Sequence, residues 1–145
     1  MRLLREVVAM TARSATFEIL GQPRPQGSMR SWRTKFGKIV TTHANAAVLM
    51  PWRQEIAAVA KRAWDGGPSA LPISVTFVFN MKKPKSAKKS VVWPVTRPDA
   101  DRLCRAVFDA MTGVCYHDDS QVVHVCATKV YADTPSAIIT VKEME

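Results

Sequence analysis

Residues 97–129 contain the feature that most restricts the fold of this chain. The segment begins with a proline-containing turn and continues over residues 100–112 with apolar residues at helical spacing. Gly113 ends that pattern, and an alternating, strand-like segment follows over residues 121–131. The stretch therefore predicts a helix, a turn and a strand that belong to an α/β domain.

Carboxylates lie at both junctions of this helix–turn–strand unit. Asp99 and Asp101 are at the predicted start of the helix, and Asp118 and Asp119 precede the predicted strand. If the helix and the strand pack as neighbours, the turn is long enough to bring Asp119 close to Asp99 and Asp101. Hard divalent cations prefer oxygen ligands and assist phosphodiester hydrolysis. The clustered aspartates therefore indicate a metal site.

Each acidic pair also has a structural explanation when it is considered alone. A carboxylate near a helix N-terminus can be a capping group, and an acidic pair before a strand can be an ordinary turn. The charge of the whole chain favours the metal site, because 21 Lys and Arg face 12 Asp and Glu, which gives a net charge of +9. This balance indicates a polyanionic partner such as nucleic acid, with solubility or a membrane surface as the alternative.

Several sequence blocks resemble the signature of the RusA family of Holliday-junction resolvases, which are small, homodimeric, magnesium-dependent endonucleases of bacteria, prophages and phages. The blocks are Asp-Ala-Asp at residues 99–101, Phe-Asp-Ala-Met at 108–111 and Asp-Asp-Ser-Gln-Val at 118–122. A Gly-x-Pro-x-Pro segment at 21–25 extends the resemblance upstream. It covers roughly residues 17–141 and implies an α/β (α+β) fold, a small mixed β-sheet packed with helices, in a homodimer.

The resemblance also assigns roles to the acidic residues. Asp99, Asp101 and Asp119 match the three aspartates that bind metal and are catalytic in the family. Asp118 matches the preceding acid and is a weaker metal ligand. The implied cofactor is Mg²⁺, with Mn²⁺ as a substitute.

Two arginines depart from the family pattern. Arg105 occupies the place of the family's functional lysine, one helical turn after Asp101. It keeps the positive charge and can bind phosphate bidentately, but it is effectively never deprotonated. We therefore expect Arg105 to stabilise charge during catalysis and not to transfer a proton. Arg102 stands where the family usually has Asn and would exchange a hydrogen bond near the metal for a phosphate contact.

Basic residues outside the acidic constellation are the expected DNA contacts. A lysine-rich segment at residues 81–90 predicts a mobile loop that becomes ordered on phosphate, and a plain solvated loop is the alternative. Lys129 lies at a position where family members often carry lysine. The expected DNA-binding residues are Arg24, Arg30, Lys82, Lys83, Lys85, Lys88, Lys89, Arg102 and Lys129.

Residues 28–42 combine basic and aromatic residues in a pattern typical of a hairpin. Trp32 and Phe36 alternate with arginines and lysines, and Gly37 is where the tip would be. This composition suits phosphate contact together with base or sugar stacking. The alternative is an ordinary solvated hairpin whose aromatic residues are packing groups.

The rest of the chain predicts one domain over residues 14–145, preceded by an N-terminal extension, residues 1–13, of uncertain order. Strands are expected near residues 16–20 and 71–80, and a helix over 45–64. No apolar run approaches the roughly 20 residues of a membrane span, and no secretory signal is apparent. We expect a cytoplasmic protein of a bacterial cell, encoded by the host, a prophage or a phage.

The combined pattern predicts an endodeoxyribonuclease that depends on Mg²⁺ and resolves four-way junctions by paired symmetric nicks. Two-fold symmetric cleavage is what a homodimer provides. One alternative is a junction-binding or regulatory nucleic-acid-binding protein that does not cut. Another is a nuclease for flaps or single strands.

Overall fold

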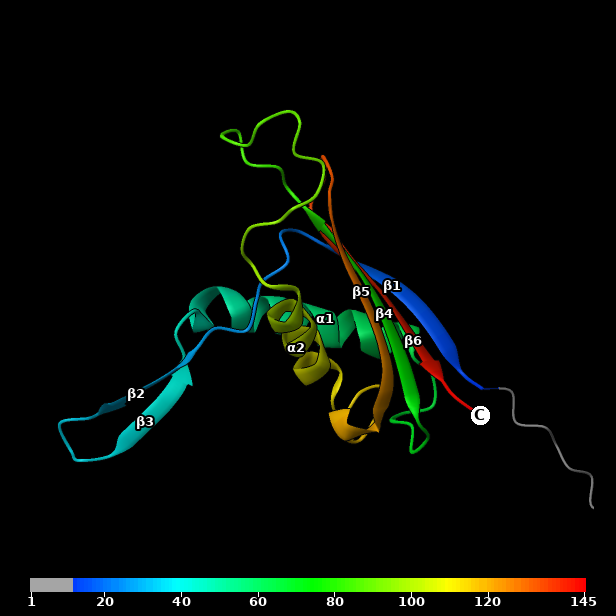
Figure 1. Ribbon diagram of the computed structural model, residues 1–145. Coiled ribbons are helices and arrows are strands. Elements are labelled where there is room, and N and C mark those ends of the chain that lie inside the picture. Colours follow the sequence, from blue (N-terminus) through cyan, green and yellow to red (C-terminus); the bar gives the residue numbers. More distant parts are fainter. Residues whose placement is uncertain (1–11) are drawn as a thin grey trace, which may run out of the picture.

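The computed structural model describes residues 12–145, which form a four-stranded sheet, two helices that cover one of its faces, and a separate two-stranded hairpin (Figure 1). The predicted mixed sheet packed with helices is confirmed. The elements are β1 (Ser14–Leu20), β2 (Met29–Arg33), β3 (Ile39–His43), α1 (Ala46–Ala63), β4 (Ile73–Met81), α2 (Ala100–Met111), the 3₁₀ turn η1 (Asp119–Gln121), β5 (Val122–Tyr131) and β6 (Ser136–Glu143).

The sheet has the strand order β1-β6-β4-β5. Only β4 and β5 are parallel, and the other two pairings are antiparallel. A parallel pair needs a crossover, and the chain makes it through the 82–99 loop and α2. The helix–turn–strand unit that the sequence predicted is therefore the second half of a β-α-β unit.

The core lies between this sheet and the two helices. β4 contributes Phe77 and Phe79, both fully buried, because its inward positions alternate with less buried ones. The ring of Phe108 on α2 packs edge-on against Phe77, with ring centroids 5.4 Å apart. Leu103 and Val107 of α2 are also fully buried, so the helix that carries the first acidic pair is fixed by packing.

The N-terminal end of the described chain is fastened to the sheet. Of the predicted extension 1–13, residues 1–11 lie outside the described residues. Arg13 donates hydrogen bonds from its backbone nitrogen and from Nε to Glu143, at 2.8 and 2.9 Å. Its Nη1 atom donates to the carbonyl oxygens of Asp65 and Gly67. Arg13 therefore belongs to the folded body.

The two helices of the described part are not membrane spans. Neither α1 nor α2 is both long enough and apolar enough to cross a lipid bilayer.

Candidate active site

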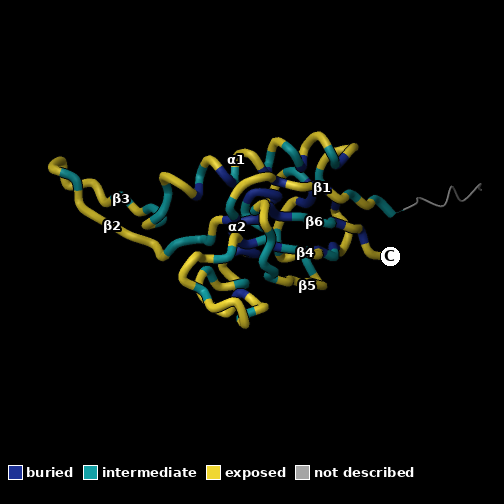
Figure 2. Tube along the Cα trace, turned by 90° about the horizontal axis from the view of Figure 1, so that it is seen from above, coloured by how far each residue is buried: buried dark blue, intermediate teal, exposed yellow. Residues whose placement is uncertain are grey.

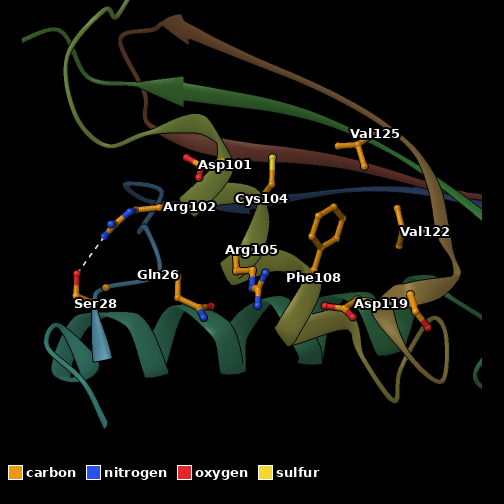
Figure 3. A pocket seen from close by; sticks show the side chains of 12 residues that line it. Gln26, Ser28, Asp101, Arg102, Cys104, Arg105, Phe108, Asp119, Val122 and Val125 are labelled. Atoms are coloured by element: carbon orange, nitrogen blue, oxygen red, sulfur yellow. Dashed lines mark hydrogen bonds between the residues drawn. The ribbon is translucent and has the colours of Figure 1, made fainter. Parts of the chain in front are cut away.

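A pocket of about 680 Å³ lies between α2, the start of β5 and the segment that precedes β2 (Figure 3). Three parts of the chain that are far apart in the sequence line it. The lining residues are Gln26, Gly27, Ser28, Asp101, Arg102, Cys104, Arg105, Phe108, Asp119, Ser120, Val122 and Val125. The pocket thus combines carboxylates and guanidinium groups with an apolar wall.

Asp101 and Asp119 both line this pocket, but they lie at opposite ends of α2. Asp101 is in the first turn of the helix, whereas Asp119 begins η1 after the chain has left the other end of the helix. The twelve residues of α2 span roughly 18 Å. In Figure 3 the two carboxylates accordingly stand on opposite sides of the pocket, with Arg105 and Phe108 between them.

Within one chain, Asp119 is therefore at the other end of α2 from Asp99 and Asp101, although Asp101 and Asp119 line the same pocket. The strand that follows a helix after a short turn runs back along it, so its first residues lie beside the C-terminal end of the helix. In agreement with this geometry, no group of three His, Cys, Asp or Glu side chains within residues 12–145 is arranged to hold a metal ion.

The first acidic pair is exposed and is not used as a helix cap. Asp99 occupies the N-cap position of α2, yet its side chain makes no capping hydrogen bond. It lines a neighbouring groove of about 560 Å³, where its Oδ2 atom is 4.0 Å from Nε of Arg102. The capping explanation thus fails for Asp99, and the carboxylates of Asp99 and Asp101 are both available to a ligand.

The second acidic pair divides into two different roles. The side chain of Asp118 accepts a hydrogen bond of 2.8 Å from the backbone nitrogen of Ser120 and forms a capping box with Gln121. Hydrogen bonds from Ser120 hold the pKa of Asp118 below its ordinary value. Asp119 instead faces the pocket. The turn explanation therefore accounts for Asp118, and Asp119 is the member of the pair available for chemistry.

Gln121 fixes this turn, although it is not among the site residues predicted from the sequence. Its Oε1 atom accepts hydrogen bonds from the backbone nitrogens of His117 and Asp118, at 2.8 and 3.0 Å. Its Nε2 atom donates to the carbonyl oxygens of Ser69 and Leu71, at 2.8 and 3.0 Å. The spacing Asp-x-x-Gln at 118–121 is that of a capping box and is the signal that would have identified Gln121.

Arg102 and Arg105, the two arginines that differ from the family pattern, line the pocket. The side chain of Arg105 points into it and forms no ion pair with any residue in the described range 12–145. Nη1 of Arg102 donates a long hydrogen bond of 3.5 Å to Oγ of Ser28, drawn as a dashed line in Figure 3. Oδ2 of Asp109, one turn after Arg105, lies 4.0 Å from Nη1 of Arg53 on α1.

Cys104 is the one buried ionisable group in the wall of this pocket. Burial, together with the nearby carboxylate of Asp101, raises the pKa of its thiol to about 11. Cys104 is therefore a neutral packing residue at physiological pH.

Most of the expected DNA-binding residues are exposed, but two lysines have partners within the fold. Arg24, Arg30, Arg102, Lys82, Lys85, Lys88 and Lys89 are exposed. Lys83 donates a hydrogen bond of 2.7 Å to the carbonyl oxygen of Val91 and lies over the ring of Tyr131. Lys129 donates to the carbonyl oxygens of Thr96 and Pro98. These two lysines stabilise the loop between β4 and α2.

Comparison with known proteins supports the resemblance seen in the motifs. The family model described as endodeoxyribonuclease RusA matches residues 21–142. The protein YqaN of Bacillus subtilis strain 168, described as uncharacterized, is 31% identical over 142 residues, which cover 88% of this chain and 95% of YqaN. The crossover junction endodeoxyribonuclease of Lactococcus phage r1t is 41% identical over 61 residues, 41% of this chain and 44% of the phage protein. The chain belongs to the RusA endodeoxyribonuclease family.

Proposed function

We propose that this protein is a divalent-metal-dependent endodeoxyribonuclease that cleaves four-way DNA junctions. The observation that carries the proposal is that Asp101 and Asp119 line one open pocket with Arg105 between them, on a chain of net charge +9. Family membership supports the nuclease activity, and the name of the similar phage protein supports a branched substrate.

The donor atoms fit a hard cation, although residues 12–145 of one chain do not bring three such side chains together. Asp99 and Asp101 are exposed carboxylates without a capping role, and carboxylate oxygens are the ligands that Mg²⁺ and Mn²⁺ prefer. We assign Asp99, Asp101 and Asp119 as the metal ligands and leave Asp118 to its capping role. When bound, such a cation polarises the phosphoryl group, acidifies water and neutralises the leaving oxygen.

The separation of the acids along α2 favours a homodimer as the active form. In a two-fold dimer, a contact between two different surface segments occurs twice, with the roles of the chains exchanged, so the Asp119 end of each chain can meet the Asp99 and Asp101 end of the other. Two sites built in this way are related by the dimer axis. They would cut the two strands of a four-way junction symmetrically.

The chain's own cations would bind and orient the DNA strand. Arg105 reaches into the pocket from the middle of α2 and is placed to stabilise negative charge on the phosphate. Arg102 stands at the rim, shared between the pocket and the neighbouring groove. The exposed lysines of the 82–99 loop lie just before α2 in the chain and supply salt-dependent contacts to the arms of the junction.

The test is cleavage of a labelled synthetic four-way junction, with a linear duplex and a flap of matched sequence as controls. Paired, symmetric nicks in the junction that require Mg²⁺ or Mn²⁺ and disappear in EDTA are the expected result. Asp101→Asn should abolish the nicks and retain junction binding. Asp133→Asn, which changes an exposed aspartate in the turn before β6, is the matched control and should cut normally.

Three results would contradict the proposal. Tight junction binding without nicks in either metal would identify a non-catalytic binder. The departures from the family pattern at Arg102 and Arg105 would then be the first explanation to test. Equal cleavage of the flap or of single strands would assign a different substrate. Normal cleavage by the Asp101→Asn protein would show that the metal ligands lie elsewhere.

A further inference from the structure

The hairpin formed by β2 and β3 projects from the body of the protein as an arm (Figure 1). Its two strands pair only with each other, as a sheet separate from the four-stranded one. All five residues of β2 are exposed, and Figure 2 shows the arm as a largely exposed segment beyond α1. A two-stranded hairpin is marginally stable by itself in water. An arm of this kind suggests a surface that is covered by a partner.

The root of the arm is fixed to the wall of the pocket. The backbone nitrogen of Ala44 donates to the carbonyl oxygen of Ser28 at 2.9 Å, and Nδ2 of Asn45 donates to that of Pro25 at 2.8 Å. Ser28 itself lines the pocket and contacts Arg102. The root of the arm therefore shares Ser28 with the candidate active site.

The tip of the arm presents an aromatic ring to solvent. The backbone nitrogens of Thr34 and Gly37 donate to the carbonyl oxygens of Lys38 and Thr34, at 2.8 and 2.9 Å, and close the turn. Gly37 has φ of +79°, a left-handed conformation that glycine adopts without strain. The side chain of Phe36 at this turn is 86% exposed. The sequence-based alternative that the aromatic residues of the hairpin are packing groups is thus wrong for Phe36.

The chemistry of the arm matches nucleic acid. Residues 28–42 carry four cationic side chains and no carboxylate, and Trp32 is 45% exposed beside Arg30. Cations at this density attract a phosphate backbone, and an exposed ring can stack on a base. In a linear duplex the base faces are hidden within the stack, whereas a branch point interrupts the stack and exposes them.

We infer that the β2–β3 hairpin is a DNA-binding arm whose Phe36 ring stacks on the exposed face of a base pair at the branch point. Its cations contact the phosphates on either side. This role rests on the proposed function, because it assumes a branched DNA substrate. It deepens that function by assigning the preference for junctions over duplex to one side chain outside the acidic site.

The test measures binding in EDTA, so that it does not depend on cleavage. Affinities for a fixed four-way junction and for a linear duplex are compared for the wild type and for Phe36→Ala, Phe36→Leu and Phe36→Trp. Loss of one base stack should weaken junction binding about tenfold or more in Phe36→Ala and Phe36→Leu. Phe36→Trp should restore it, and duplex binding should stay within about twofold of wild type in all three. Because Phe36 is exposed, none of the variants should lose stability.

Other outcomes would overturn the inference or, separately, the proposed function. Unchanged junction binding by Phe36→Ala, or an equal loss of affinity for junction and duplex, would show that Phe36 does not recognise the branch point. Conversion of a wild-type dimer to a monomer by Phe36→Ala in analytical ultracentrifugation would assign the arm to a second copy of the chain. A protein that binds as expected and never nicks DNA would refute the proposed nuclease while leaving the arm intact.

Discussion

Nζ of Lys129, near the end of β5, donates a hydrogen bond of 2.8 Å to the carbonyl oxygen of Pro98, the residue before Asp99. A second hydrogen bond of 2.9 Å goes to the carbonyl oxygen of Thr96. Two of the three donors of the ammonium group are thus used within the fold. Lys129 ties the outer strand of the sheet to the turn that begins α2, and so it positions the first acidic pair.

Replacement of Lys129 by Met should release this turn. We expect a loss of about 2 kcal/mol in the free energy of unfolding, because two carbonyl groups lose a charged donor. Cleavage of a four-way junction should fall further than the loss of stability explains, because Asp99 and Asp101 would no longer be held in place. Chemical denaturation and cleavage rates at several Mg²⁺ concentrations measure the two effects, and a raised Mg²⁺ requirement is the specific sign of a displaced ligand.

Lys142 of β6 provides the control for this experiment. It is exposed, lies on the same sheet and carries the same charge, so Lys142→Met should leave the Mg²⁺ requirement unchanged. Lys129→Arg should retain part of the activity, since a guanidinium group can still donate to both carbonyl oxygens. If Lys129→Met only weakens DNA binding and leaves the Mg²⁺ requirement alone, the residue is a phosphate contact, as the sequence analysis predicted.

Gln121 should position the second acidic pair in the way that Lys129 positions the first. Its amide makes four hydrogen bonds to backbone groups on both sides of the turn that carries Asp119. Gln121→Ala leaves these groups without partners, and we expect a loss of about 2–3 kcal/mol in unfolding free energy together with slower cleavage.

Gln121→Glu separates the hydrogen bonds that residue 121 accepts from those that it donates. The carboxylate can still accept from His117 and Asp118, but it cannot donate to Ser69 and Leu71. We expect stability between that of the wild type and Gln121→Ala in urea denaturation. A Gln121→Ala protein as stable as wild type would mean that water replaces the amide at no cost.

The sequence predicted the elements of the site better than their arrangement in space. Apolar periodicity identified α2, because its inward face packs against the core at fixed spacing. The alternating apolar residues that identified β5 are not core residues, since Val123 and Val125 are exposed. The distance between Asp101 and Asp119 depends on the direction in which β5 runs, and here the end of β5, not its beginning, lies beside the start of α2. The residue types alone do not give this direction, which follows from the shortness of the turn between α2 and β5.

The roles of two lysines within the fold were also beyond the sequence. Lys129 and Lys83 are basic residues in a basic chain, and only the positions of backbone carbonyl groups show that both are used inside the fold. Phe36 is the opposite case. An aromatic residue in a small hairpin is usually buried, and its exposure follows from the distance of the arm from the core.

Glu143 should make the stability of the fold depend on acidic pH. Burial acts to raise the pKa of its carboxyl group, but hydrogen bonds from Ser69 and Arg13 outweigh burial and hold the pKa below the ordinary value of 4.5. A group whose pKa is lower in the folded state stabilises the protein above its unfolded pKa, and this stabilisation is lost as the pH falls through the folded pKa. The contribution is therefore complete at neutral pH and disappears in acid.

We accordingly expect Glu143→Gln to lower the unfolding free energy by roughly 2 kcal/mol at pH 7. The difference from the wild type should shrink as the pH falls below 4.5, where the wild-type carboxyl group also becomes neutral. Urea denaturation at a series of pH values measures it. Glu18→Gln, in an exposed position of β1, is the control and should show no such trend. A Glu143→Gln deficit that is constant from pH 7 to pH 3 would refute this explanation.

The position of the acids at opposite ends of α2 predicts complementation between two inactive variants. Asp101→Asn and Asp119→Asn should each be inactive alone. If each site takes Asp101 from one chain and Asp119 from the other, a mixed dimer has one site with both substitutions and one site with neither. Mixing the two variants should therefore restore cleavage, and the product should be a single nick per junction, because only one of the two sites is intact.

A site contained within one chain predicts the opposite result. Every chain in the mixture would then carry a damaged site, and no ratio of the two proteins would cut. A mixture of Asp101→Asn with Asp99→Asn is the internal control, because both substitutions fall at the same end of α2. Each site of such a mixed dimer carries one of the two substitutions. This pair should stay inactive under either arrangement. Cleavage by the first mixture but not by the second would establish that the acidic site is shared between two copies of the chain.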